Sequence, residues 1–264
     1  DYCKLSETPE TNPNPTLEIY TTGDATLFEE IAENWLHRKG LEVKTVTLEE
    51  KLTTIQLGKE IVIATNNVGK AKEFAKIFEP KGYKIKTLKD FPELDEVEET
   101  GTTFEENARL KAETIANALQ TIVLADDSGL CVDALEGLPG VYSARFAGEE
   151  KNDAANNAKL LSELGGLKGK ERSAHFTCCL VLAAPFKESL VVQAECHGEI
   201  ATLPSGDSGF GYDPLFLVPE YQKTFAELGM DIKNKISHRA KAIELLVEKW
   251  EHWTNSLGAV EETE

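Results

Sequence analysis

Short apolar runs alternate with amphipathic stretches along most of this chain. The run Ile61–Ala64 indicates a strand, and the positions after it repeat apolar side chains at the spacing of a buried helical face. The same reasoning predicts further strands at 83–88, 121–125, 172–184 and 190–203, and helices at 71–78, 103–119, 153–164 and 237–253. Thr103 and Glu106 form the T-x-x-E capping box that opens the second of these helices. Strands that alternate with helices, followed by two long strands, predict an α/β fold with a mixed sheet.

The pattern also divides the chain. Residues 1–59 are predicted to form a small α/β appendage or a fragment of a larger domain, with a proline-rich lead-in, strands at 17–20 and 42–47 and a helix at 26–38. This extension contains no motif with recognisable chemistry, and its role is open. Residues 60–257 are predicted to form the main domain, and residues 258–264 an acidic tail.

Composition and charge limit the kinds of molecule that this protein is expected to bind. The chain has 264 residues and a formal net charge of −18, which argues against a nucleic-acid backbone or an anionic membrane as partner. No stretch approaches the ~18 apolar residues of a membrane span. The five cysteines are odd in number and lack zinc-like spacing, and Cys178 and Cys179 fall within an apolar run typical of a core. This usage predicts a reducing, cytoplasmic location.

The segment Leu124–Gly129 carries the strongest chemical signal. The apolar run 121–125 is expected to end there and to deliver Asp126, Asp127 and Ser128 to one point. Ligands of open α/β sheets bind at the carboxyl ends of strands. Adjacent carboxylates repel each other unless a cation joins them, so the segment indicates a hard-metal site, most naturally Mg²⁺, facing an anionic substrate. The alternative is a plain surface turn.

Two other segments favour phosphate binding. The loop from Thr65 to Lys70 joins a strand to a helix, so its amides lie where a helix N-terminus attracts anions. It lacks Walker A spacing, and the alternative is an ordinary βα turn. Glu98 and Glu99 precede the helix at 103–119, where a carboxylate could join the metal site or simply be solvated. On that helix Asn107 and Lys111 share one face.

Two later segments have features that suit a purine base. The glycine-flanked loop 208–214 holds Phe210, Tyr212 and Asp213, whose rings could stack on a base or pack into the core as part of a hairpin turn. Ser237 is the predicted N-cap of the last helix, and His238 and Arg239 follow it. Arginine only donates hydrogen bonds, so Arg239 would favour a 6-keto purine, unless the pair is surface decoration.

The joint occurrence of these segments resembles one known family. The motifs T-N-N-V-G-K, E-E-T-G-x-T-F-x-E-N-A-x-x-K-A, A-D-D-S-G-L, P-G-V-Y-S-A-R, F-G-Y-D-P-x-F and S-H-R, in this order, closely resemble the inosine triphosphate pyrophosphatase family. The resemblance covers about residues 60–253. One departure is Asn66, where many members have glycine.

The resemblance implies hydrolysis of non-standard purine nucleoside triphosphates (ITP, dITP and XTP) to the monophosphate and pyrophosphate, with Mg²⁺ as cofactor. By position, it implies Asp127 as general base and Glu98, Asp127 and Asp126 as metal ligands. The implied substrate-binding residues are Thr65, Asn66, Asn67, Val68, Gly69, Lys70, Lys111, Ser128, Phe210, Gly211, Tyr212, Asp213, Lys233, His238 and Arg239.

The implied fold is an elongated mixed sheet flanked by helices, with two lobes around a nucleotide cleft, and the implied assembly is a homodimer. Two alternatives stay open. One is a catalytically silent purine-nucleotide sensor regulated by residues 1–59, and the other is a pyrophosphatase of the same fold with another base preference, such as modified pyrimidines.

Overall fold

A computed structural model describes residues 2–4, 18–20, 59–65, 68–185 and 187–255, and the chain divides into two units, Asp1–Leu57 and Gly58–Glu264. In the first unit, strand β1 (Tyr2–Lys4) pairs antiparallel with β2 (Glu18–Tyr20), which confirms the strand expected at 17–20. The helix expected at 26–38, the strand at 42–47 and the tail at 258–264 lie outside the described residues.

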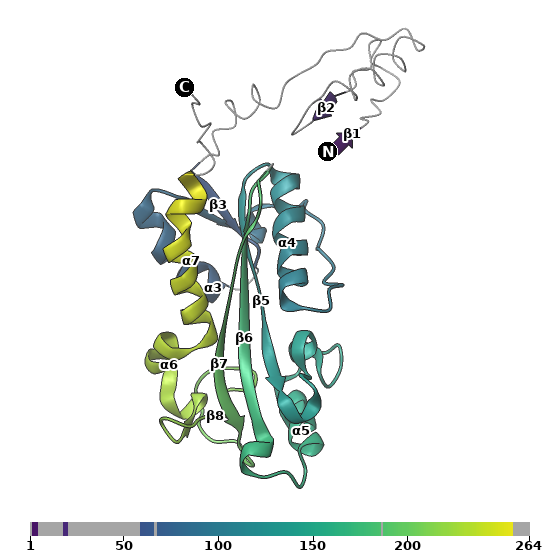
Figure 1. The fold of residues 1–264 in the computed structure, drawn as a ribbon, viewed down its shortest axis with the longest axis vertical. Coiled ribbons are helices and arrows are strands. Elements are labelled where there is room, and N and C mark those ends of the chain that lie inside the picture. Colours follow the sequence, from purple (N-terminus) through teal and green to yellow (C-terminus); the bar gives the residue numbers. More distant parts are fainter. Residues whose placement is uncertain (1, 5–17, 21–58, 66–67, 186, 256–264) are drawn as a thin grey trace, which may run out of the picture. The chain divides into compact units, whose positions relative to one another are not determined.

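The second unit is built on a mixed sheet of seven described strands in the order β4-β3-β5-β6-β7-β8-β9 (Figure 1). Only β3 makes parallel pairs, with β4 and β5, and the remaining pairs are antiparallel. This confirms the predicted fold class. The strands are β3 (Glu60–Ile63), β4 (Lys84–Thr87), β5 (Ile122–Val132), β6 (Ser173–Ala183), β7 (Leu190–Ile200), β8 (Phe216–Val218) and β9 (Lys223–Thr224).

Helices cover both faces of this sheet. Figure 1 shows α4 on one side of the long strands and α6 and α7 on the other. The helices are α3 (Val68–Phe78), α4 (Phe104–Leu119), α5 (Asp153–Glu163), α6 (Phe225–Ile236) and α7 (His238–Asn255). The sequence pattern did not predict α6, although Thr224 and Glu227 form a capping box at its start.

Two hydrophobic clusters hold these layers together. One packs α4 on the face of β5 and β6 that carries Val123, Ala125 and Cys179. The other packs α5 and α6 on the opposite face of the strands, around Leu130, Phe176 and Phe225. Cys178 and Cys179 are both fully buried in β6, as the apolar run predicted.

Strand β5 is longer than the sequence pattern predicted, and the expectation that it ends at Ala125 was wrong. It continues to Val132 because β6 pairs with it along its whole length, from Val123 to Val132, so the backbone groups past Ala125 keep their ladder partners. The shorter β3 pairs only with residues 122–124. The two aspartates therefore lie just beyond the carboxyl end of β3, within β5 itself.

Candidate active site

Asp126 and Asp127 are neighbours on an unbroken strand, so their side chains point to opposite faces of the sheet. The contacts agree with this alternation. The Asp126 carboxylate meets side chains from α3 and α7, whereas the Asp127 carboxylate meets a side chain from α4. The structure therefore does not bring the two carboxylates together around one point, and it excludes a surface turn.

Asp126 is a buried anion held between two cations. Its Oδ2 lies 2.6 Å from Lys70 Nζ and 3.3 Å from Arg239 Nη2, and the residue is only 5% exposed. Burial opposes ionisation, but the charges of Lys70 and Arg239 outweigh it and hold the pKa of Asp126 at about 2. Asp126 is therefore ionised at every physiological pH, and both cations contact its Oδ2.

Asp127 has the opposite electrostatic setting. Burial raises its pKa, the charge of Lys111 lowers it and the charge of Glu99 raises it, with a net value of about 6. Asn107 Nδ2 donates to Asp127 Oδ2 at 3.1 Å, and the backbone N–H of Ser128 donates to Oδ1 at 3.0 Å. Asp127 can therefore exchange a proton close to neutral pH.

The amide of Asn107 is oriented by a backbone group. Its Oδ1 accepts from the N–H of Gly101 at 2.7 Å, so its Nδ2 must face Asp127. A Cβ at Gly101 would lie 2.7 Å from that same Oδ1, which explains why the T-G step in the motif needs glycine. Asn107, which carried little weight by sequence alone, thus positions the carboxylate.

Of the two adjacent glutamates, Glu99 is the one that reaches this cluster. Its Oε1 lies 2.8 Å from Lys111 Nζ, and its charge acts on Asp127. Glu98, the expected metal ligand, is exposed, whereas Glu99 is half-buried. Lys111 also donates to the backbone oxygen of Asp126 at 2.6 Å, and these contacts raise its pKa although burial lowers it. Sequence spacing could not decide which glutamate faces Lys111.

The expected phosphate loop lies beside this cluster. Thr65 follows β3, and α3 begins at Val68, with Gly69 and Lys70 in its first turn. Lys70 brings that turn to Asp126 through their ion pair. Asn66 and Asn67 lie outside the described residues. Ser128 is on the Asp126 face of β5, opposite Cys178 of β6, and its buried Oγ has no hydrogen-bond partner among the described residues.

The loop expected to hold a base is built around a buried ion pair. Asp213 is 2% exposed, pairs with Lys233 and accepts from the N–H of Phe210 at 3.0 Å. A Cβ at Gly209 would lie 2.0 Å from Asp213 Oδ2, so glycine permits this tight turn. The Tyr212 ring packs into the core, but the Phe210 ring is 58% exposed, with Lys233 Nζ 4.5 Å from its centre.

His238 lies near both Lys233 and the ion pairs around Asp126. Its ring stacks on Phe176 at 4.8 Å, and burial, reinforced by the charges of Arg239 and Lys233, lowers its pKa well below the usual value. The imidazole is therefore neutral. Its Nδ1 and the Nε of Arg239 have no hydrogen-bond partner within the part of the chain that the structure describes. Ser237 Oγ caps α7 by accepting from the N–H of Ala240 at 3.2 Å, as predicted.

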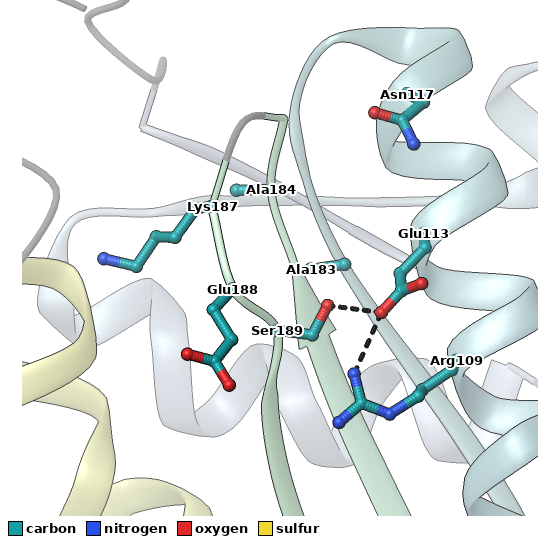
Figure 2. Close-up of a pocket in the computed structure, with 8 residues that line it drawn as sticks. All are labelled: Arg109, Glu113, Asn117, Ala183, Ala184, Lys187, Glu188 and Ser189. Carbon is teal, nitrogen blue, oxygen red and sulfur yellow. Dashed lines mark hydrogen bonds and ion pairs between the residues drawn. The ribbon is translucent and has the colours of Figure 1, made fainter. Parts of the chain in front are cut away.

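A separate cavity of about 320 Å³ lies near the β6–β7 turn (Figure 2). Its wall includes Arg109 and Glu113, on the face of α4 opposite to Asn107 and Lys111. These charges are already paired, since Arg109 Nη1 lies 3.0 Å from Glu113 Oε1 and Ser189 Oγ donates to the same oxygen at 2.8 Å. This cavity is not part of the cluster around Asp127.

Two further features of the described residues concern membrane insertion and metal binding. None of the described helices is long and apolar enough to cross a membrane. Among these residues, no group of three or more His, Cys, Asp or Glu side chains is arranged to hold a metal ion.

Comparisons with known proteins agree with this arrangement. A dITP/XTP pyrophosphatase of Geobacillus kaustophilus is 55% identical over 203 residues, which are 77% of this chain and 100% of that protein. A dITP/XTP pyrophosphatase of Streptococcus pyogenes is 58% identical over 197 residues, but this chain spans only 60% of its length. The solved structure of the Staphylococcus aureus Ham1 protein matches with a TM-score of 0.70 and 49% identity, over 73% of this chain and 98% of that one. The model of the Ham1 family matches residues 61–249, and this chain belongs to the Ham1 family.

Proposed function

We propose that this protein hydrolyses ITP, dITP and XTP between the α and β phosphates, releasing the nucleoside monophosphate and pyrophosphate. The observation that carries this proposal is a carboxylate with a pKa of about 6, Asp127, beside Lys111 and Glu99 in a Ham1 chain. The 55% identity to a dITP/XTP pyrophosphatase supports the choice of substrate.

In this proposal Asp127 is the general base that takes a proton from the attacking water. A base works best when its pKa lies near the working pH, and a value of about 6 leaves Asp127 mostly ionised at neutral pH while it stays basic enough to accept a proton. Asn107 donates to Oδ2 and the Ser128 N–H donates to Oδ1, so one lone pair of each oxygen is still available to accept a proton or bind a cation.

The donor set fits Mg²⁺. Glu99 and Asp127 are hard oxygen donors close enough for their charges to interact, and Mg²⁺ in nucleotide enzymes usually takes one or two carboxylates together with substrate phosphates. We therefore propose Glu99 and Asp127 as ligands. Asp126 is left out because Lys70 and Arg239 engage its carboxylate on the other face. Bound Mg²⁺ would supply charge neutralisation and a more acidic water.

The triphosphate would lie across Lys70, Lys111 and the first turn of α3, which includes Val68 and Gly69. A helix N-terminus and two ammonium groups favour an anion locally, although the chain as a whole carries a net charge of −18. Thr65, Asn66 and Asn67, which precede this turn, are proposed to contact the phosphates as well.

The base would stack on the exposed Phe210 ring and meet polar groups from α6 and α7. Lys233 and Arg239 only donate hydrogen bonds, and a 6-keto oxygen accepts them, whereas the 6-amino group of adenine does not. The unpartnered Nδ1 of His238 is a further polar atom on this side. These features favour a purine such as hypoxanthine or xanthine over adenine.

The decisive experiment compares turnover of ITP, XTP, dUTP, GTP and ATP with Mg²⁺, with separate assays for pyrophosphate and orthophosphate. ITP and XTP should be hydrolysed fastest, with pyrophosphate as product. Asp127→Asn should lower kcat by a factor on the order of 10²–10⁴, the usual contribution of a general base, while ITP still binds. Equal turnover by wild type and variant would contradict the role given to Asp127.

The same assay separates the alternatives. A silent sensor would bind ITP without releasing pyrophosphate, and a pyrimidine-specific enzyme would prefer dUTP. The half-buried Asp127, with its raised pKa, argues against silence, because a sensor has less need of a base. A homodimer and a cytoplasmic location are further proposals, which rest on the family resemblance and on the reduced cysteines.

A further inference from the structure

Helix α5 carries two side chains that hold the loop proposed to bind the base. We propose that Asp153 and Asn157 are positioning residues, which set the orientation of the Phe210 ring and thereby the affinity for the purine. This inference rests on the proposed function, because it assigns these residues to the part of the same site that is proposed to bind the purine.

Both side chains bind the peptide groups of one residue, Gly211. Asp153 Oδ2 accepts from the N–H of Gly211 at 2.8 Å, and Asn157 Nδ2 donates to the carbonyl oxygen of Gly211 at 2.9 Å. Residues 153 and 157 are four apart on a helix, so they lie on one face and reach the loop together. Gly211 follows Phe210 directly, and its two peptide planes are therefore both clamped.

The orientation of the Asn157 amide is decided by this contact. A carbonyl oxygen can only accept, so Nδ2 must face Gly211. As a result Oδ1 is buried with no donor among the described residues, an arrangement that destabilises the folded state. The amide gives up one hydrogen bond while it holds the loop, which is what a side chain selected for stability alone would not do.

The Phe210 side chain has few other restraints. It is 58% exposed, and its backbone N–H is held by Asp213, on the loop itself. The clamp on Gly211 restrains the chain on the other side of Phe210. A loop ordered before the ligand arrives loses less conformational entropy on binding, so the clamp should strengthen base binding.

The clamp should leave the chemical step unchanged. The hydrogen bonds of Asp153 and Asn157 described above go to the loop, while Asp127 is held by Asn107 and Ser128 on β5 and α4. Loss of the clamp should therefore raise KM for ITP without an equal fall in kcat, and it should not weaken binding of phosphates alone.

The test uses the full chain with Asp153→Ala, Asn157→Ala, the conservative Asp153→Asn, and Glu163→Ala as a control for loss of a carboxylate from the exposed end of the same helix. Three quantities are measured with Mg²⁺: kcat and KM for ITP, the inhibition constant of inorganic tripolyphosphate, and the hydrogen-exchange rate of the Gly211 amide. Because tripolyphosphate has no base, it tests only the residues proposed to bind the phosphates.

Both alanine variants should raise KM about tenfold, the effect of one hydrogen bond to a charged or buried group, with kcat within about twofold of wild type. The tripolyphosphate constant should not change, Asp153→Asn should restore KM through its remaining acceptor oxygen, and the Gly211 amide should exchange faster in Asp153→Ala than in Glu163→Ala.

Unchanged KM in both alanine variants would overturn the inference, as would tripolyphosphate inhibition that weakens in parallel with KM. A wild-type protein that fails to hydrolyse ITP would overturn the proposed function instead. In that case hydrogen exchange still decides the clamp: an unchanged Gly211 rate in Asp153→Ala would refute it on its own.

Discussion

The two faces of β5 place identical neighbouring residues in opposite electrostatic settings. On the face of α3 and α7, Asp126 lies between Lys70 and Arg239 and has a pKa of about 2. On the face of α4, Asp127 is half-buried near Glu99 and has a pKa of about 6. The first aspartate is a counterion that links α3 and α7 to the sheet, and the second can gain or lose a proton close to neutral pH. The role of a carboxylate here depends on its face, not on its position in the motif.

The largest expected effect is on stability, and it tests whether the two aspartates differ as described. Asp126→Asn should lower the free energy of unfolding at pH 7 by roughly 3 kcal/mol, the lower end for a buried pair, because it leaves two partly buried cations without their buried anion. Asp127→Asn should cause no comparable loss. Chemical denaturation of both variants with EDTA present measures the difference, and equal losses would mean that the two faces are electrostatically alike.

A smaller effect should appear in the pH dependence of Asp127→Asn. The folded pKa of Asp127, about 6, lies above its unfolded value, so the folded state binds the extra proton. Its contribution to stability is therefore greatest below the unfolded pKa and is lost as pH rises through about 6. Without metal, Asp127→Asn should stabilise the protein relative to wild type at pH 8 more than at pH 4.

The contribution of Asp126 to stability depends on pH in the opposite direction. The pKa of Asp126 is depressed, so its stabilising contribution is present above its unfolded pKa and is lost as pH falls toward about 2. Asp126→Asn should therefore be most harmful at neutral pH and less so in acid. Parallel pH profiles of the two variants would contradict the assignment of opposite faces.

The smallest expected effect concerns the two glutamates. Glu99 raises the pKa of Asp127, so Glu99→Gln should lower that pKa, whereas the matched control Glu98→Gln should leave it unchanged. Carbon-13 NMR titration of the Asp127 carboxyl group in EDTA measures both. A shift caused by Glu98→Gln alone would restore Glu98 as the residue beside the site.

Local sequence patterns predicted much of the fold because each cap or apolar run depends only on residues within the helix or strand that it predicts. The capping box at Thr103 and Glu106, the N-cap at Ser237 and the apolar runs of β6 and β7 all appear where expected. Helix α6 was missed although Thr224 and Glu227 form the same box, because Gly229 interrupts its helical backbone with a φ of 74°. The missed end of β5 has a different cause, since the pairing of β6 prolongs that strand beyond its apolar run.

The sequence alone was sufficient to name the chemical groups of this site: adjacent aspartates after an apolar run, a lysine at a helix start, and a ring-bearing glycine loop. These signals are local, since they depend on residue type and short spacing. Tertiary structure decided which groups meet. Strand alternation separated Asp126 from Asp127, packing of α4 selected Glu99 over Glu98, and α5 brought Asp153 and Asn157 to Gly211 across 58 and 54 residues of chain. Such contacts depend on how distant segments pack, and a charge acts on its neighbours in space irrespective of their order in the chain.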